Sequence, residues 1–243
     1  MGTQPQTLTV IIPAFNEAAT CAAVVRRVRR SVVPGIVAVQ VLVVDDGSTD
    51  GTAASLPADT IVLRHERNRG KGAAIATALA HANGDLIVIQ DADLEYDPAD
   101  WPVLLEPLLD GSADVVYGSR FIGSAAHRVL YFWHYLVNRL LTLLCGMVTN
   151  LNLTDMETGA KAFRRSFVSG IRFRERAFGI EPELTIALAQ RGARFFEVGV
   201  SYHGRSYAEG KKIRARDGIR ALWVIVRDGI LRPTARAVIK SLR

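Results

Sequence analysis

The sequence predicts an α/β protein whose mostly parallel sheet is covered by helices on both faces. Five short apolar runs lack the alternation of apolar and polar residues that a half-exposed strand shows. Helix-like segments separate these runs, which is the order expected of a parallel sheet. Polar and acidic residues follow where several of the runs end. With 243 residues, about half of them apolar, the chain can form one large domain, or one domain with a small appendage.

The apolar runs are the expected strands, at residues 8–14, 39–46, 60–66, 85–91 and 113–120. A helix is expected over residues 16–30, where apolar side chains recur at helical spacing. The turn sequence GSTDGT follows the second strand, and Ser48 or Thr49 is expected to be the N-cap of a short helix.

Two further helices are expected before residue 120. NRGKGAAIATALAHANG, residues 68–84, predicts a loop and then an Ala-rich helix that Gly84 closes at the C-cap position. Asp97 and Pro98 are expected to be the N-cap and the first residue of the next helix. Helices would therefore alternate with strands throughout the first half of the chain.

The pattern changes after Arg120. Residues 128–153 are very apolar and rich in aromatic side chains. The uncharged run of residues 140–154 is shorter than the roughly 18–20 residues that a membrane-spanning helix requires. A buried or interfacial helix is therefore expected there.

A basic amphipathic helix is expected near the C-terminus. Its apolar face would consist of Ile219, Leu222, Trp223, Val226 and Ile230. Its surrounding cations would be Arg214, Arg216, Arg220 and Arg227. Such a helix is typical of a membrane surface, and a helix packed on the domain with a solvated basic face is the alternative. We therefore divide the chain into a domain of residues 1–212 and a helical segment of residues 213–243.

The net charge and the two cysteines limit which partners and which cellular compartment are expected. The net charge is +6 and the pI is about 9.6, which suits nucleic acid, anionic lipid or a phosphorylated substrate as partner. A soluble protein that is simply rich in arginine is the alternative. The isolated Cys21 and Cys145 give neither a metal spacing nor a disulfide framework, and the N-terminus has no secretion signal. We therefore expect a cytoplasmic protein.

Polar side chains gather at the ends of the expected strands. They are Asn16 and Glu17, which follow Pro13 after the first strand, Asp45 and Asp46 at the second, Asp91 and Asp93 at the fourth, and Ser119 and Arg120 at the fifth. In an open parallel sheet the carboxyl ends of the strands form the edge where ligands bind. The sequence therefore predicts one binding site built from these residues.

The stretch QDADLEYDP suggests a metal within that site. Alternating carboxylates suit Mg²⁺ or Mn²⁺, which prefer oxygen ligands and often bridge to substrate phosphates. The pattern Asp91-Ala92-Asp93 is common on surface loops, but its place at the end of a buried strand favours a metal–diphosphate site. In NRGKGAA, glycines and Lys71 at a helix start could cradle phosphate, and an ordinary strand–helix loop is the alternative.

Taken together, the motifs resemble those of a known family. VIIPAFNE, VLVVDDGSTDGT, NRGKGAA, QDADLEYDP, DVVYGSRF and METGAKAFRR occur in this order. The chain is thus similar, over about residues 9–212, to a family 2 glycosyltransferase with the GT-A fold. Within that family it most resembles the dolichyl- and polyprenyl-phosphate sugar synthases, such as dolichyl-phosphate mannose synthase.

The resemblance implies a role for each motif. The nucleotide-binding residues would be Pro13, Phe15, Glu17, Asp45, Asp46, Lys71, Asp91 and Ala92. The metal, Mg²⁺ or Mn²⁺, would be held by Asp91, Asp93 and Glu95, where Glu95 stands at a position that is often Gln in the mannose synthases. The catalytic groups would be Asp93, Arg120, Arg205 and Lys211, and the acceptor phosphate would be bound by Arg120, Arg128 and Arg139.

The resemblance also implies a reaction. An inverting enzyme would move a sugar from a UDP- or GDP-sugar to a polyprenyl or dolichyl phosphate at the cytoplasmic face of the membrane. The alternative acceptor is a hydroxyl group of a glycan, glycolipid or small molecule in cell-envelope polysaccharide synthesis. That reaction requires a base, for which Asp155 or Glu157 is the candidate. A homo-oligomer or a membrane partner protein stays open.

Two other classes of protein fit the sequence less well. A nucleic-acid-binding protein would show aromatics interleaved with cations or a helix-turn-helix, and acids in the cleft would repel phosphate. A nucleotidyltransferase would usually carry a glycine-rich loop after the first strand, where PAFNE stands instead.

Overall fold

A seven-stranded sheet forms the centre of the computed structural model, which describes residues 5–123, 131–205 and 215–232. The strand order is β3-β2-β1-β4-β6-β5-β7. The strands are β1 (Gln6–Ala14), β2 (Ile36–Asp45), β3 (Ile61–Arg64), β4 (Leu86–Ile89), β5 (Val115–Ser119), β6 (Lys161–Arg164) and β7 (Phe195–Gly199). Among them β6 alone runs antiparallel to its neighbours, β4 and β5. The prediction of a mostly parallel sheet is confirmed.

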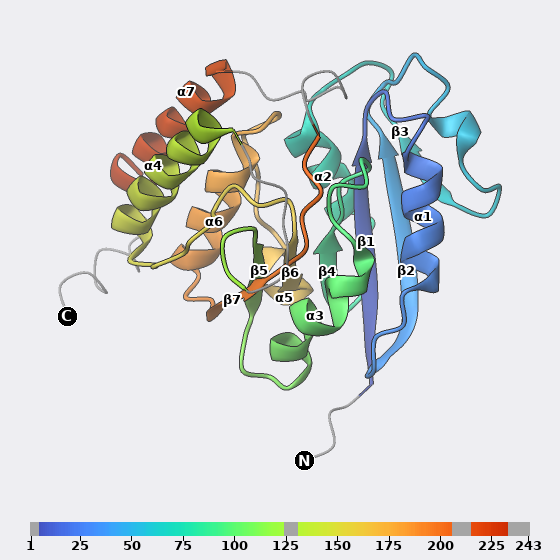
Figure 1. Ribbon diagram of the computed structural model, residues 1–243, viewed down its shortest axis with the longest axis horizontal. Helices are drawn as coiled ribbons and strands as arrows, with labels where there is room; N and C mark the ends of the chain where they lie inside the picture. The colour runs from blue at the N-terminus through green and yellow to red at the C-terminus, as the bar shows by residue number, and fades with distance from the viewer. Residues whose placement is uncertain (1–4, 124–130, 206–214, 233–243) are drawn as a thin grey trace.

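Helices cover both faces of this sheet (Figure 1). They are α1 (Cys21–Arg30), α2 (Lys71–Leu79), α3 (Trp101–Leu109), α4 (Phe132–Thr149), α5 (Arg165–Val168), α6 (Ile180–Gln190) and α7 (Ala215–Val224). One core packs α1 and α3 on the sheet, and a second core packs α2 and α6 on the opposite face. Val10 of β1 belongs to the first core and Ile11 to the second, so both faces of the strand are apolar. This explains why the strands lack alternation.

The first half of the chain follows the prediction with three corrections. The helix expected over residues 16–30 begins only at Cys21, with Thr20 as its N-cap. Asp97 caps a 3₁₀ turn, Pro98–Asp100, as expected, and α3 follows it. The helix N-cap expected at Ser48 or Thr49 was wrong: the short 3₁₀ turn is Ala53–Ser55 and its N-cap is Thr52. Ser48 instead accepts a hydrogen bond from the backbone N–H of Asn16, which ties the first two strand ends together.

Gly84 does not close α2. The helix ends at Leu79 with Ala80 as its C-cap. Gly84 lies against β1, where a Cβ atom would stand 2.5 Å from the backbone nitrogen of Thr9. The glycine is therefore required by a close approach between two backbones and not by a helix end.

α4 and α7 form a third layer outside α6 (Figure 1). Ala221 of α7 and Ile225 of the following π-helical turn, Ile225–Ile230, are buried with Leu141 and Cys145 of α4. The C-terminal helix thus packs on the domain. However, Ile219, Leu222 and Trp223, which were predicted to form its apolar face, are exposed.

The other predictions for this end of the chain have mixed outcomes. Among the described residues no helix is long and apolar enough to cross a membrane. The boundary at residues 212 and 213 falls outside the described residues, as do Arg214 and the residues after 232, so the two-part division stays a prediction.

Candidate active site

A cavity of about 400 Å³ opens at the end of β2, between the strands and the loop of residues 48–54. Asp45 forms part of its wall, with a side chain that is almost fully buried. Its Oδ1 accepts a hydrogen bond from the backbone N–H of Ser48 at 2.9 Å. Its Oδ2 has no hydrogen-bond partner among the described residues, although Arg64 Nε makes an ion-pair contact with it at 3.3 Å. The cavity thus offers one buried acceptor beside one cation.

Asp46 positions the loop that leads to α2. Its carboxylate accepts hydrogen bonds from the backbone N–H groups of Arg69 and Gly70, at 2.9 and 2.6 Å, and contacts His65. Gly70 has a φ of +96°, and a Cβ there would lie 2.3 Å from the carbonyl oxygen of Arg176. Only glycine fits this position. Asp46 therefore contributes to the site through the loop that it holds.

Lys71, the first residue of α2, reaches into the site. Its Nζ lies 2.9 Å from Asp91 Oδ1 and 3.1 Å from Glu181 Oε1. Burial alone would lower the pKa of Lys71, but the two carboxylates outweigh it and raise the pKa well above its usual value. The ammonium is therefore a fixed positive charge next to Asp91.

Three carboxylates surround Arg205, which follows β7. Arg205 Nη2 lies 2.7 Å from Asp93 Oδ2, Nη1 lies 3.3 Å from Glu17 Oε1, and Nε lies 3.4 Å from Glu95 Oε1. Burial, and next the charges of Asp91 and Glu95, raise the pKa of Asp93 to about 7 in spite of Arg205. The guanidinium thus occupies the place where the acids of QDADLEYDP would hold a cation.

The carboxylates fit a divalent metal as a pair and not as a triad. No group of three or more acidic, His or Cys side chains in the described parts of the chain could hold a metal ion together. Asp91 contacts Lys71, whereas Asp93 and Glu95 contact the same guanidinium. Mg²⁺ usually takes one or two protein carboxylates and completes its shell with substrate phosphates and water. Asp93 and Glu95 are compatible in number with that requirement, and the metal roles of Asp91, Asp93 and Glu95 all stay predictions.

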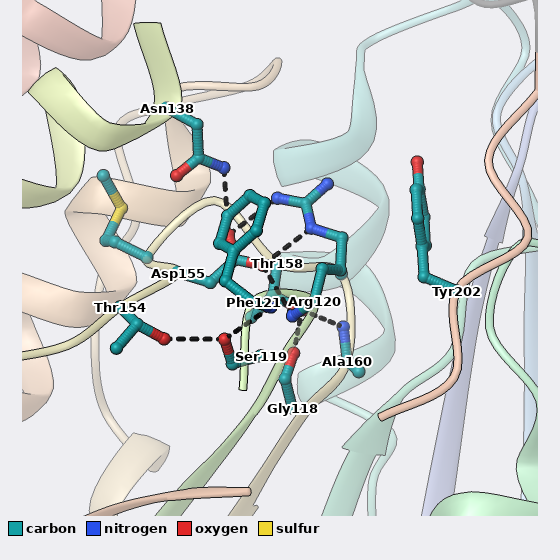
Figure 2. Close-up of polar contacts among 12 residues, drawn as sticks. Gly118, Ser119, Arg120, Phe121, Asn138, Thr154, Asp155, Thr158, Ala160 and Tyr202 are labelled. Carbon is teal, nitrogen blue, oxygen red and sulfur yellow. Dashed lines mark hydrogen bonds and ion pairs between the residues drawn. The ribbon is translucent and has the colours of Figure 1, made fainter. Parts of the chain in front are cut away.

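Arg120 lies at the end of β5 and is clamped by Asp155 (Figure 2). Arg120 Nε lies 2.6 Å from Asp155 Oδ2, and Nη2 lies 2.7 Å from Oδ1. Asn138 of α4 donates a further hydrogen bond to Asp155 Oδ1 at 2.9 Å. Burial opposes the ionisation of Asp155, but the bonds from Arg120 hold its pKa below the usual range. The guanidinium is therefore fixed in place by a fully buried carboxylate.

Tyr202 connects the two cationic groups. Its ring centroid lies 5.2 Å from Arg120 Cζ, and its hydroxyl donates a hydrogen bond to Glu95 Oε2 at 2.9 Å. The backbone N–H of Arg205 donates to the other oxygen of Glu95 at 2.8 Å. Glu95 thus fixes the segment that carries both Tyr202 and Arg205. The sequence did not point to Tyr202, because β7, the strand that precedes it, was not predicted.

Glu157 has a different environment from Asp155. It is half-buried, and its Oε1 has no hydrogen-bond partner among the described residues. Burial, and next the charge of Glu181, raise the pKa of Glu157 to about 7. Of the two candidate bases, Asp155 is occupied by Arg120, whereas Glu157 can accept a proton near neutral pH.

The other predicted site residues are Pro13, Phe15, Ala92, Arg128, Arg139 and Lys211. Pro13 and Phe15 are half-buried at the end of β1, and Ala92 is packed in the core under α1 and α3. Arg139 is exposed on α4, whereas among the described residues Asp155 is bonded by Arg120 and Asn138. Arg128 and Lys211 lie outside the described residues. The roles of all these residues stay predictions.

Comparison with known sequences identifies a family and several relatives. The family model described as glycosyl transferase family 2 matches residues 9–172. An uncharacterized protein of Methanocaldococcus jannaschii is 30% identical over 219 residues, which are 84% of this chain and 93% of that protein. The glycosyltransferase AglJ of Haloferax volcanii is 30% identical over 83% of this chain and 64% of its own length. An undecaprenyl-phosphate 4-deoxy-4-formamido-L-arabinose transferase of Pseudomonas aeruginosa is 31% identical over 84% of this chain and 60% of its own length. The chain therefore spans less than two thirds of the latter two.

Solved structures show the same fold. The glucosyl-3-phosphoglycerate synthase of Mycobacterium tuberculosis, crystallised with Mn²⁺, UDP and phosphoglyceric acid, superposes with a TM-score of 0.71. The match covers 91% of this chain and 78% of that one at 23% sequence identity. A crystal of the same enzyme with Mg²⁺ and UDP gives the same TM-score. The prediction of the GT-A fold is confirmed.

Proposed function

Because the chain belongs to glycosyl transferase family 2, we propose that it moves a sugar from UDP to a polyprenyl phosphate at the cytoplasmic face of a membrane, with inversion at the anomeric carbon. The observation that supports this acceptor most directly is Arg120, a buried guanidinium that is clamped by Asp155 and lies over the ring of Tyr202, whose hydroxyl binds Glu95 of the candidate donor site. A phosphate acceptor requires such a cation, whereas a hydroxyl acceptor requires a base.

The Asp45 cavity favours uracil as the base of the donor. Uracil presents one N–H donor between two carbonyl acceptors, whereas guanine presents two adjacent donors. Only Oδ2 of Asp45 is without a hydrogen bond, because Ser48 occupies Oδ1, and Arg64 beside it can donate to a carbonyl. One acceptor next to one donor matches uracil better than guanine. The UDP bound in the solved synthase structures agrees with this proposal.

The cations and carboxylates at the ends of β4 and β7 would bind the donor diphosphate. Asp93 and Glu95 would hold Mg²⁺ or Mn²⁺, which supplies charge neutralisation for the leaving diphosphate. Arg205, displaced from these carboxylates, and Lys71 would pair with the phosphate oxygens. Lys71 remains charged throughout, because Asp91 and Glu181 raise its pKa.

The transfer step then requires no general base. A phosphate oxygen of the acceptor, already anionic near neutral pH, forms the bond to the anomeric carbon. The bond from that carbon to the diphosphate oxygen breaks, and UDP leaves with its electron pair. Arg120 would orient the acceptor phosphate, since Asp155 and Asn138 prevent its guanidinium from rotating. The relative named for undecaprenyl phosphate supports a lipid phosphate as acceptor.

A hydroxyl acceptor is the second candidate, and Glu157 favours it. Its raised pKa and its unbonded Oε1 are what a base near neutral pH would have. In that reaction Glu157 would take the hydroxyl proton as the oxygen attacks. The glycan, glycolipid or small molecule that would carry the hydroxyl is open.

The experiment that separates these functions measures transfer of labelled sugar from UDP- and GDP-sugars with Mn²⁺ or Mg²⁺. The acceptors are a polyprenyl phosphate and a panel of hydroxyl compounds. We expect the wild type to form labelled lipid from UDP-sugars. Asp93→Ala and Arg120→Gln should lose most of this activity, whereas the exposed control Asp59→Ala should keep all of it. Label only in a hydroxyl acceptor, lost in Glu157→Gln, would favour the second candidate. Tighter binding of GDP than of UDP would contradict the assignment of the base.

A further inference from the structure

We propose that the outer side of α4 and α7 is a docking surface for an anionic lipid bilayer. This inference deepens the proposed function, on which it rests for the lipid acceptor, but the docking itself requires no catalysis. The α4–α7 face consists of Trp133, Leu136, Leu140, Leu143 and Met147 of α4, together with Ile219, Leu222 and Trp223 of α7. All of these side chains are exposed large hydrophobics. The two helices that carry them belong to the outer helical layer of the molecule (Figure 1).

α4 is apolar on two opposite sides. Leu141 and Cys145 face inward and are buried against α6 and α7. The outward residues recur at intervals of three and four, and Trp133 and Met147 at the two ends are 71% and 72% exposed. A helix that is apolar all round is normally buried on all sides. The outer stripe of α4 therefore lacks the cover that its composition requires.

α7 extends this stripe into a wider surface. Gly218 and Gly229 lie against Val137 and Val148 of α4, and a Cβ at Gly229 would stand 2.6 Å from Val148 Cγ2. The two helices therefore run close together, and their exposed side chains lie on neighbouring ridges. Ile219 is 72% exposed, whereas Ala221 and Val224 on the opposite side of α7 are buried. The helix thus turns its larger apolar side chains outward.

The charges around this face fit an anionic surface. Residues 132–149 contain Arg139 and no acid, and Arg216 lies two turns before Trp223 on the same side of α7. Arg220 is half-exposed although it binds Glu175, and Arg232 is exposed. In sequence, residues 233–243 add three cations and no acid. Aromatic and apolar side chains surrounded by arginines are typical of helices that lie in a lipid interface. A second copy of this chain would bring the same cations face to face, which opposes a dimer at this surface.

The face also lies next to the candidate acceptor site. Asn138 and Thr142, on the inner side of α4, reach Asp155 and the backbone N–H of Met156. Asp155 in turn clamps Arg120. A bilayer on the outer side of α4 would therefore lie roughly one helix diameter, about 10 Å, from the residues that position Arg120. This arrangement would present the phosphate of a membrane-anchored acceptor to the site.

The test measures sedimentation of the full chain with vesicles. We expect binding to vesicles of phosphatidylglycerol and phosphatidylcholine, weak binding to phosphatidylcholine alone, and release at high salt. Leu140→Glu with Leu143→Glu should abolish binding, whereas Val103→Glu, at a site on α3 that is 51% exposed, should not. Arg216→Gln with Arg232→Gln should weaken binding roughly fivefold for each charge removed, and Arg26→Gln with Arg30→Gln on α1 should have less effect. Circular dichroism establishes that each variant folds.

Three results would overturn the proposal. The first is equal vesicle binding by the α4–α7 variants and the wild type. The second is a concentration-dependent dimer in ultracentrifugation that Leu140→Glu with Leu143→Glu abolishes, which would assign the face to a second copy. The third is vesicle binding that appears only after residues 233–243 are removed, which would mean that this tail covers the face. Two combined outcomes separate this proposal from the proposed function. Vesicle binding without any sugar transfer would contradict the proposed function alone. Transfer to a short, water-soluble polyprenyl phosphate without vesicle binding would contradict the docking alone.

Discussion

Arg205 explains how acids can lie side by side at the end of β4. The sequence suggested a divalent cation between Asp91, Asp93 and Glu95. In the structure a guanidinium stands there, because the segment after β7 brings Arg205 to within 2.7 Å of Asp93. A metal bound by Asp93 and Glu95 would therefore compete with Arg205 for the same carboxylates. Donor diphosphate would relieve this competition by giving Arg205 a new anionic partner.

Arg205→Gln tests this competition. We expect the variant to bind Mn²⁺ more tightly than the wild type in the absence of UDP, because Asp93 and Glu95 lose their internal cation. Its sugar transfer should fall by about 10²-fold or more, because a charge that stabilises the leaving diphosphate is gone. Titration of Mn²⁺ followed by electron paramagnetic resonance measures the affinity, with the exposed Arg29→Gln as control. Unchanged or weaker Mn²⁺ binding without UDP would contradict the competition.

Glu157 and Asp155 provide opposite effects of pH on stability. The pKa of Glu157 is raised from 4.5 to about 7, so the folded protein holds this proton more tightly than the unfolded chain. Stability is therefore lost as the pH rises from about 4.5 to about 7. We expect Glu157→Gln to raise the free energy of unfolding at pH 8, by up to about 3 kcal/mol, and to change it little at pH 4. Urea unfolding at both pH values measures the difference.

The control for this prediction is Asp155→Asn. Arg120 lowers the pKa of Asp155, so the ionised carboxylate stabilises the fold above the pH at which the unfolded side chain titrates. Asp155→Asn should therefore destabilise the protein at pH 8. A gain in stability from Glu157→Gln that is the same at pH 4 and pH 8 would show that the carboxyl is not the cause.

At the scale of elements, strand prediction succeeded where strands are continuous and apolar. β6 and β7 were not predicted, for different reasons. The sequence of β6 is KAFR, and its Lys161 is fully buried because it pairs with Glu181 of α6, a partner distant in sequence. β7 lies at the edge of the sheet, and its side chains are half-buried or exposed. Neither strand therefore carries the apolar run by which the others were found.

The C-terminal helix shows a second limit of periodicity. Its spacing correctly grouped Ile219, Leu222 and Trp223, but it does not say which side faces the core. Ala221, Val224 and Ile225 fill the narrow space against α4 and α6, while Arg220 and Arg227 bind Glu175. Long-range ion pairs and small side chains thus decide the orientation, and neither leaves a signal in the local sequence.

Gly218 of α7 and Gly229 of the π-helical turn that follows it make matched variants. At Gly229 a Cβ would clash with Val148 at 2.6 Å, so Gly229→Ala should lower the free energy of unfolding by about 1–3 kcal/mol. At Gly218 the nearest atom, Val137 Cγ1, is 3.5 Å away, so Gly218→Ala should be neutral or stabilise α7 by up to about 1 kcal/mol. Thermal and urea unfolding compare the two variants. Equal effects of both substitutions would mean that close packing on α4 is not what requires Gly229.

At the scale of the molecule, the arrangement of the site was predictable from the sequence because a parallel sheet aligns the ends of its strands. That rule brought Asp45, Asp93 and Arg120 to one edge without knowledge of any contact. The partners of these residues were not predictable. Asn138, Glu181 and Tyr202 come from distant segments whose positions depend on the complete fold. The sequence therefore predicts which strand ends come together, whereas the pairing of the charges there requires the structure.

The whole molecule also makes a prediction about salt. The α4–α7 face and the candidate donor site belong to different layers, so docking and chemistry should respond differently to ionic strength. Transfer to a long-chain polyprenyl phosphate in anionic vesicles should fall steeply between 50 and 500 mM NaCl, since salt screens exposed arginines from the lipid surface. Transfer to a short, water-soluble polyprenyl phosphate should fall much less, because Arg120 and Asp155 are buried and screened from salt already. Initial rates with the two acceptors, measured in parallel with vesicle sedimentation, make the comparison. If both rates fell in parallel, salt would be acting on the chemistry of the site, and the surface of α4 and α7 would have no part in delivering the acceptor.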